Sequence, residues 1–517
     1  MTVKSAMTPA AEIVLLNGRI LAGEGNPTAL AVAGGKVIAT GGDRDIRRLA
    51  TRHTTVLECG GRRVIPGIVD AHCHVLAAAA SALRVDCRPS ATRDVNAIVA
   101  ALRRAAPVSG NWVRGYGYDD SPVGLGRHLN RYDLDLVSTV RPVRVEHRSG
   151  HACVLNSLAL HSVGIDRLTP DPPGGVIVKD RDGEPTGLLL EMSNWLSRRT
   201  GAGEASSPGA MADALGEYGH RVLAYGMTGV TDAGPDNGLD RWRYFEARIG
   251  DGTLPLRLTM MVGWDLLEQM RAAGLGYGAT SKDGLLTVGH AKIMLTASIG
   301  QLRPDPEQLG AMVAHAHELG FPVAIHAVER DAVVASALAI TEAPPMASGH
   351  GGWPRDRIEH CAECPPDVLE LVAQSGAMVV PNPGFLHYDG ERYIRTVDAD
   401  LLPHLYPVGA LVDRGIPTAL GSDAPVIEPN PWGSMAAAVS RQSAGGADLG
   451  GVHIKSVAEA LALHSGARRI APGMDADIAV VEPDPFAMPK FDLSNVRSVA
   501  TIVAGRLAWR GAGLPAT

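Results

Sequence analysis

The chain has 517 residues, of which 45% are hydrophobic and 20% charged, and its formal net charge is -7. This length exceeds one ordinary core, so we expect two domains, and the negative balance argues against a nucleic-acid partner, which needs a basic face. No window holds about 18 uninterrupted apolar residues, so we expect no membrane partner. Residues Met1 to Ala11 lack the apolar core of a secretory signal, and we therefore expect a cytoplasmic protein.

Both ends of the chain have the pattern of short β-strands. Ile13–Leu16 near the N-terminus, and Asp477–Val481 and Val496–Val503 near the C-terminus, have strand character. Neither end is large enough for its own core, so we expect residues 1–63 and 470–517 to form one small β-sandwich domain. Two unrelated β appendages are the alternative.

The middle of the chain alternates strand-like and helix-like segments. The strand-like segments include Val143–Val145, Gly229–Thr231, Leu256–Thr259, Ala291–Leu295, Pro322–His326, Arg357–His360, Ala377–Val380 and Pro417–Gly421. Such alternation indicates a parallel sheet, either a closed barrel or an open sheet. The open dinucleotide-binding sheet is disfavoured, because no GxGxxG follows an early strand.

The spacing of polar residues after these strands favours the barrel. Such residues are Lys292, His326, His360 and Asp423, with gaps of 326 − 292 = 34, 360 − 326 = 34 and 423 − 360 = 63 residues. One strand–helix unit of a (β/α)8 barrel takes roughly 31 residues, so the gaps span one, one and two units. We therefore predict an α/β fold with a distorted TIM-like barrel over residues 64–469.

The first barrel strand is predicted to end at His72 and His74, which places Lys292, His326, His360 and Asp423 on strands four, five, six and eight. The 218 residues between His74 and Lys292 far exceed three units. We therefore expect an insertion at about residues 77–226. Because the active site of such a barrel lies at the carboxyl ends of its strands, this insertion would act as a lid.

The pattern His72-Cys73-His74 is half of a metal site, since alternate residues of a strand point to the same face. A single histidine near a strand is more often structural, but four histidines and an aspartate at one end of a barrel are hard to explain that way. Imidazole and carboxylate ligands suit Zn, Mn, Fe or Ni, with zinc the default for hydrolysis. Lys292 either faces outward to a salt bridge or is carboxylated to a carbamate that bridges two metals, and the spacing leaves both open.

The six cysteines are too few, in a chain of this length, to form a disulfide framework. Cys361 and Cys364 form a CxxC pair typical of zinc or redox sites, but no second pair completes a structural zinc site. We expect buried thiols.

Over nearly its whole length the sequence resembles the amidohydrolase superfamily, in its branch of YtcJ-like and N-substituted formamide deformylase-like metal-dependent hydrolases. The resemblance rests on the order and spacing of Pro66–His74, Ser149–Ala152, Asp182–Gly187, Gly229–Gly234, Ile325–Ala327, Arg357–His360 and Leu420–Pro425. It implies a TIM-like barrel with a composite β-sandwich. It also implies one or two divalent metal ions bound by His72, His74, His326, His360 and Asp423, and it matches Lys292 to a lysine that is carboxylated in many relatives.

Two departures from the family pattern lie beside the predicted ligands. Thr296-Ala297-Ser298 stands where relatives commonly have Asp-Gly-Ser, and Val328-Glu329 stands where they commonly have Gly-Asp. Both put the identity of the substrate in doubt.

The family pattern and metal chemistry together predict hydrolysis of an amide, formamide or cyclic amide by a metal-activated water. Asp423 is expected to touch the metal, to take the water's proton and to deliver it to the leaving amine. His326 is expected to help stabilise the oxyanion. The alternatives are a deaminase or decarboxylase on the same scaffold, or a barrel that has lost catalysis and binds a ligand.

A small-molecule substrate is the expected partner, and Trp112, Tyr118 and Asp119 of the insertion are candidates for its binding wall, with ordinary packing as the alternative. The family match places His151 near the site, and Trp432 lies near a barrel end. Whether the protein is a monomer or a homodimer stays open.

Overall fold

The structure is a computed structural model of the chain. It describes residues 10–22, 25–89, 91–105, 112–193, 195–196, 199–200, 207–297, 300–346, 355–466 and 468–513. Residues before Ala10, and the predicted departure at Ser298, therefore lie outside the described residues. The chain divides into two compact units, one formed by Met1–His74 and Gly219–Thr517 and the other by Val75–Tyr218.

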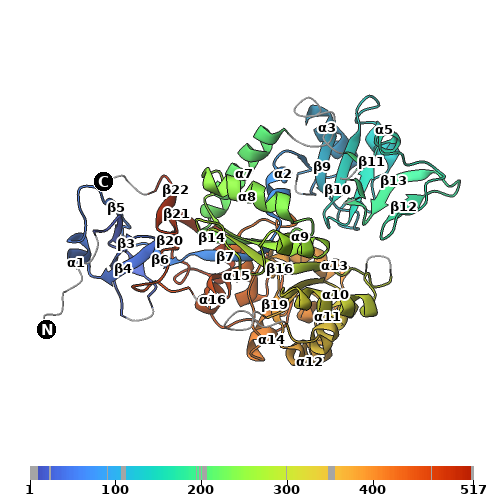
Figure 1. Ribbon diagram of the computed structural model, residues 1–517. Helices are drawn as coiled ribbons and strands as arrows, with labels where there is room; N and C mark the ends of the chain where they lie inside the picture. Colours follow the sequence, from blue (N-terminus) through green and yellow to red (C-terminus); the bar gives the residue numbers. More distant parts are fainter. Residues whose placement is uncertain are drawn as a thin grey trace. The chain divides into compact units, whose positions relative to one another are not determined.

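The first unit contains a seven-stranded parallel sheet in the order β19-β18-β17-β16-β15-β14-β7 (Figure 1). The strands are β7 (Ile68–Cys73), β14 (Met227–Asp232), β15 (Arg257–Gly263), β16 (Leu286–Met294), β17 (Val323–Ala327), β18 (Arg357–His360) and β19 (Met378–Val380). Strands such as β17 are buried at every residue, as expected for parallel strands covered on both faces. The first and the last strand lie at opposite edges, so one further element is needed to close a barrel.

Residues 417–423 occupy the place of that eighth strand. On the β19 side, Ala419 N donates to the Val379 carbonyl at 3.1 Å, and on the β7 side Ala71 N donates to the Leu420 carbonyl at 3.0 Å. The segment forms only an isolated parallel bridge to β19 and is not a regular strand. The predicted α/β barrel is thus confirmed as a nearly closed one whose last strand is irregular.

Helices follow the barrel strands, among them α10 (Pro306–Glu318), α11 (Arg330–Glu342) and α12 (Pro366–Ser375). α10 packs on β17, α11 packs on β17 and β18, and α12 packs on α11. α10 begins with a capping box in which Asp305 and Gln308 each accept from the other's backbone N–H. α12 buries Val368, Leu369 and Val372, an i, i+1, i+4 pattern that gives the helix one apolar face. These helices shield the barrel strands from water.

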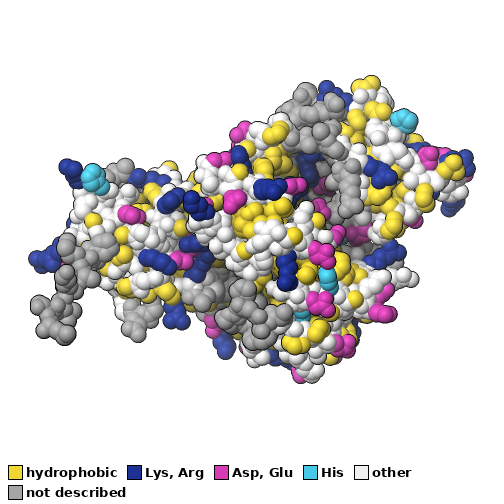
Figure 2. Space-filling model, viewed as in Figure 1, with side chains coloured by type: hydrophobic (Ala, Val, Ile, Leu, Met, Phe, Trp, Pro, Cys, Tyr) yellow, Lys and Arg dark blue, Asp and Glu magenta, His cyan; other side chains and the backbone are white. Residues whose placement is uncertain are grey.

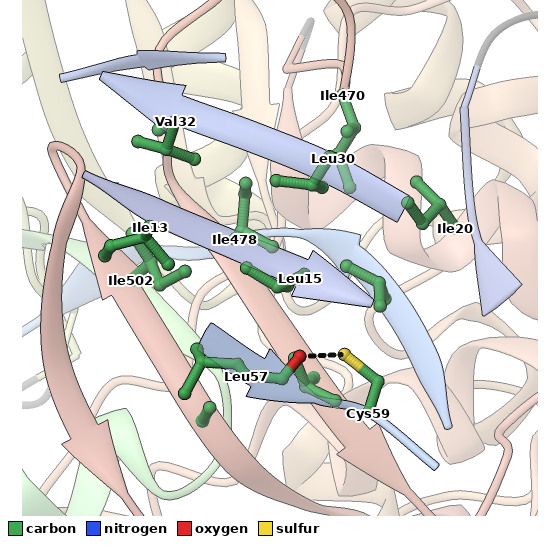
Figure 3. Close-up of a cluster of buried hydrophobic side chains, with 14 of the residues drawn as sticks. Ile13, Leu15, Ile20, Leu30, Val32, Leu57, Cys59, Ile470, Ile478 and Ile502 are labelled. Carbon is green, nitrogen blue, oxygen red and sulfur yellow. Dashed lines mark hydrogen bonds between the residues drawn. The ribbon is translucent and has the colours of Figure 1, made fainter. Parts of the chain in front are cut away.

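Two further sheets of the first unit share one hydrophobic core (Figure 3). One has the order β4-β3-β1-β5 and the other β2-β6-β20-β21-β22. The first sheet consists of β1 (Ile13–Leu16), β3 (Ala29–Ala33), β4 (Lys36–Gly41) and β5 (Thr55–Glu58); the second of β2 (Arg19–Ile20), β6 (Arg63–Pro66), β20 (Ile478–Glu482), β21 (Arg497–Val503) and β22 (Arg506–Arg510). Leu15 and Leu30 pack in this core with Ile478 and Ile502. The two ends of the chain therefore share a sheet and a core, and β6 spans the predicted domain boundary after residue 63.

The second unit contains a six-stranded mixed sheet in the order β12-β13-β11-β10-β9-β8. Its strands are β8 (Val85–Asp86), β9 (Val113–Tyr118), β10 (Val143–His147), β11 (Ala152–Leu155), β12 (Val176–Lys179) and β13 (Pro185–Leu190). The strand predicted at Val143–Val145 is therefore β10 of this sheet and no part of the barrel, because it pairs with β9 and β11. An apolar strand does not reveal from sequence which sheet it joins.

Among the described residues, every helix is too short or too polar to cross a membrane. The face shown in Figure 2 carries Lys and Arg interspersed with Asp and Glu over its described residues. All six cysteines are buried, as the sequence predicts, and none of the six forms a disulfide. The cytoplasmic location stays a prediction.

Candidate metal centre

The five predicted histidine and aspartate ligands lie together near the carboxyl ends of the barrel strands. Nε2 of His74 lies 3.2 Å from Oδ1 of Asp423, and Nε2 of His72 lies 3.5 Å from the same oxygen. Nε2 of His360 lies 2.9 Å from Nδ1 of His326. The His72 and His360 rings join these two pairs, with centroids 4.7 Å apart. Strands β7, β17 and β18 and the closing segment thus converge on one cluster.

The backbone is strained at two of these residues. His360 and Asp423 have φ of 66° and 60°, in the left-handed region that side chains other than glycine rarely adopt. Each such residue costs of order 1–3 kcal/mol and typically occurs at functional sites. Beside them, Gly421 lets the closing segment approach β7, because a Cβ on it would lie 2.6 Å from the His72 Cβ. The local backbone is therefore shaped for the cluster rather than for regular structure.

Two buried nitrogen atoms of the cluster have no hydrogen-bond partner among the described residues: Nε2 of His72 and Nζ of Lys292. The Lys292 side chain points from β16 into the barrel with only 2% of its surface exposed. Burial lowers the pKa of Lys292 to about 8, against the opposing effect of the Glu359 and Asp423 charges. An unpaired buried amine or imidazole nitrogen is costly, so this centre has bonding capacity left over for a ligand.

The protonation of the imidazoles suits a metal ligand. Burial lowers the pKa of His72 well below its usual range and also lowers that of His360, so both rings are neutral near pH 7. Neutral imidazole is the form that binds a divalent ion. The donor set of imidazole and carboxylate therefore fits a divalent metal ion.

The cluster is held by a second layer of buried polar groups. Nδ1 of His72 contacts Oε2 of Glu359, and Arg357 donates to both oxygens of that carboxylate, at 2.7 and 3.0 Å. Nδ1 of His360 lies 2.8 Å from Oδ1 of Asn382. Asp70 accepts from the backbone N–H of His72 at 3.1 Å. Our sequence reasoning assigned no role to these four partners, although Asp70, Arg357 and Glu359 lie within the motifs that carry the family resemblance.

Comparison with known proteins identifies the family. Residues 55–508 match the amidohydrolase family. The chain belongs to this family. It is 27% identical to the putative amidohydrolase YtcJ of Bacillus subtilis over 94% of this chain and 97% of that protein. It is 28% identical to the N-substituted formamide deformylase of Arthrobacter pascens over 98% of this chain and all of that protein.

A solved structure supports the fold of this amidohydrolase. An uncharacterized metal-dependent hydrolase from Pyrococcus horikoshii superposes with a TM-score of 0.71 at 21% identity. The match covers 92% of this chain and 99% of the other. The barrel with its flanking sheets is therefore an architecture found in a solved protein.

The predicted substrate-binding residues lie in several places in this amidohydrolase. In the second unit, Trp112 packs in a hydrophobic cluster, Tyr118 is fully buried, and Nδ1 of His151 lies 3.1 Å from Oε2 of Glu191. Asp119 is also buried and accepts from a backbone N–H at 2.9 Å. In the first unit, Trp432 of α15 (Pro431–Ser440) is fully buried and donates to the Tyr225 carbonyl at 3.0 Å. A substrate contact of any of them stays a prediction.

The residues that depart from the family pattern directly follow two ligand-bearing strands. Thr296 and Ala297 come after β16, where Thr296 exchanges backbone hydrogen bonds with Arg303 at 2.9 and 3.0 Å. Val328 packs against a buried cluster, and Glu329 is the N-cap of α11 without a side-chain capping bond. These residues thus have local structural partners, and their effect on substrate choice stays a prediction.

Proposed function

We propose that this amidohydrolase hydrolyses a carbon–nitrogen bond of a small amide, formamide or cyclic amide with the help of one or two divalent metal ions. The observation that carries the proposal is the cluster of four histidines and Asp423, where His72 Nε2 and the nearby Lys292 Nζ are buried and have no hydrogen-bond partner among the residues the structure describes. The relative that is an N-substituted formamide deformylase supports formamides as one substrate class.

The residues that would hold the metal are His72, His74, His326, His360 and Asp423, and zinc is the ion this donor set favours. When bound, the ion lowers the pKa of a water toward neutrality and polarises the scissile carbonyl.

Lys292 is proposed to be carboxylated on Nζ. Its amine is buried and has no hydrogen-bond partner in the described ranges of the chain, and the neighbouring Glu359 carboxylate already accepts from Arg357 through both oxygens. The neutral amine of Lys292 attacks CO2, an N–C bond forms, and release of a proton gives a carbamate anion whose oxygen atoms can serve as ligands. This removes the cost of an ammonium ion placed next to metal cations.

Asp423 is the proposed general base and acid. Its Oδ1 lies within 3.5 Å of the Nε2 atoms of His72 and His74, where its carboxylate can both contact the ion and reach the attacking water. Asp423 takes a proton from water as the new C–O bond forms, and it delivers that proton to the nitrogen as the C–N bond breaks. His326 contributes to stabilising the negative charge on the carbonyl oxygen. The products are a carboxylate, which is formate for a formamide, and an amine.

The second unit, Val75–Tyr218, is proposed as the lid, and the two sheets with a common core as a β-sandwich domain. The support for a lid is connectivity, since the second unit begins directly after His74. A homodimer stays open.

The proposal is tested by offering N-formyl, N-acyl and cyclic amides to purified protein loaded with zinc or manganese. We expect release of equal amounts of amine and carboxylate from at least one class. The Asp423→Asn variant, purified and loaded in the same way, controls for contaminating hydrolases. Ammonia or CO2 released without the matching amine and carboxylate would instead identify a deaminase or decarboxylase.

A further inference from the structure

A chain of three buried side chains crosses the barrel interior. Arg357 and Glu359 lie on β18, and His72 lies on β7, which is not a hydrogen-bonded neighbour of β18. Glu359 and His72 are fully buried and Arg357 is 7% exposed. Arg357 also donates to the Ala71 carbonyl of β7 at 2.8 Å. The two strands are thus tied together through a buried charged pair.

The contact with Glu359 determines which nitrogen of His72 carries the hydrogen. A carboxylate only accepts hydrogen bonds, so Nδ1 of His72, which touches Oε2 of Glu359, has to be the N–H nitrogen. In the opposite tautomer, the lone pair of Nδ1 would face a carboxylate oxygen, and the two acceptors would repel each other. Nε2 is then left with a lone pair, buried and without a donor, 3.5 Å from Oδ1 of Asp423. Two electron-rich atoms facing each other in this way are arranged for a cation.

We propose that Glu359 is a positioning residue that holds His72 as the Nδ1–H tautomer and presents Nε2 to the metal, and that Arg357 fixes Glu359 for this purpose. This inference rests on the proposed function, because it assigns a role toward the metal of that site. A carboxylate behind a metal-bound histidine sets the orientation and the basicity of the ring, and its loss typically weakens metal affinity 10–100-fold.

Glu359 is not simply the counter-charge of the buried Lys292. Lys292 Nζ forms no hydrogen bond to it, whereas Arg357 donates to both carboxylate oxygens at 2.7 and 3.0 Å. A two-pronged guanidinium contact fixes the plane of the carboxylate as well as its place. His360 makes a useful contrast, since its Nδ1 faces the neutral amide of Asn382. His72, the fully buried histidine of the His72-Cys73-His74 pattern, therefore has a charged partner, whereas His360 has a neutral one.

The test is Glu359→Gln in the full-length protein, with zinc affinity measured by competition with a chromophoric chelator. We expect affinity to fall 10–100-fold, with faster zinc loss in excess EDTA. The matched control is Asp356→Asn, one residue before β18. Asp356 accepts from His317 Nε2 at 3.0 Å and from Val323 N at 2.8 Å, so this variant makes the same charge change at another histidine–carboxylate contact. The control should keep wild-type zinc affinity.

A second readout needs no metal. In metal-free protein with 15N-labelled histidine, the His72 signal, assigned with a His72→Gln variant, should report the Nδ1–H tautomer in the wild type. Glu359→Gln should lose this preference, because the glutamine amide can donate to Nδ1. An unchanged tautomer in Glu359→Gln would overturn the proposal.

Removing one charge of a buried pair can unfold a protein, since Arg357 would remain buried without its partner. The double variant Arg357→Met/Glu359→Gln removes both charges and keeps the role testable. We expect it to show the zinc affinity loss of the single variant, and wild-type affinity in the folded double variant would overturn the proposal. If the wild type itself binds no divalent ion, the proposed function fails, and the tautomer measurement still decides the role of Glu359.

Discussion

Two clusters of histidine and aspartate occur in different units of the molecule. In each, three ligand atoms lie within 4.8 Å of one another: His72, His74 and Asp423 in the first unit, and Asp119, Asp120 and His147 in the second. By proximity alone both qualify as metal sites. They differ in what their atoms already bind.

In the second unit the groups satisfy each other. The Nε2 atoms of His147 and His128 lie 2.9 and 3.2 Å from the two oxygens of Asp120, and their Nδ1 atoms lie 2.8 Å from Ser149 Oγ and 3.1 Å from Tyr118 OH. Each ring nitrogen therefore has a partner. In the first unit, by contrast, His72 Nε2 and Lys292 Nζ are buried and have no partner within the described parts of the chain. Unused bonding capacity, more than closeness, distinguishes a metal centre from a hydrogen-bonded network.

The largest expected difference between the two clusters is the effect of their loss on the metal content of the protein. We expect elemental analysis of the wild type to find one or two divalent ions per chain, and the double variant His72→Ala/His74→Ala should lose them together with all turnover. His147→Ala, which alters the cluster of the second unit, should keep the full metal content. Equal metal loss in both variants would remove the distinction between the clusters.

Asp423→Asn should leave the four histidines in place and retain much of the metal, but it removes the group that moves the proton. Turnover should fall about 10²–10⁴-fold, the usual contribution of general acid–base catalysis. Steady-state kinetics on the substrate found by screening, with metal content measured on the same samples, provides the check. A rate near that of the wild type would exclude Asp423 as the general base.

Lys292→Ala should lose most activity and recover part of it in bicarbonate or short-chain carboxylic acids, which supply the missing anion in the space left by the side chain. Lys292→Met is the matched control, because its side chain fills that space and should prevent recovery. Recovery of Lys292→Ala by short alkylamines instead of acids would show that the lysine acts as an ammonium ion.

The smallest effect is expected in the second cluster. Asp120→Asn weakens the contacts with His147 and His128, which should cost about 1 kcal/mol of stability and leave the metal content unchanged. The thermal transition of the second unit, Val75–Tyr218, should therefore shift down by roughly 3 °C. A loss of bound metal in this variant would show that the satisfied cluster also binds an ion.

The sequence predicted the ligand-bearing part of the barrel well because strand–helix units have a regular length. The 34-residue gaps between Lys292, His326 and His360 correspond to the successive strands β16, β17 and β18. The double gap before Asp423 is also observed, with β19 as the intervening strand. Residues that each end a strand of one barrel meet because the fold brings all strand ends to one rim.

Other features depend on contacts that no local pattern encodes. Glu359 contacts His72, which lies 287 positions away in the sequence. The motif Arg357–His360 therefore does not predict this partner. No local pattern predicts the left-handed backbone at His360 and Asp423, although His and Asp adopt it more often than most other side chains. The pairing of Val143–Val145 with β9 and β11 in the second unit is likewise absent from its local sequence. In each case the tertiary environment determines the contact or the backbone conformation, and the periodicity of the sequence does not predict it.

The pairing of β6 with β20, in which Pro66 lies opposite Ile478, has a consequence for synthesis on the ribosome. At about 5–20 residues per second, β6 waits roughly 20–80 s for its partner to be translated. Its apolar edge is a potential site of aggregation during that interval, and shielding it is a natural task for a chaperone. The closing segment of the barrel also arrives late, so the nascent chain carries His72 and His74 long before Asp423 can join them.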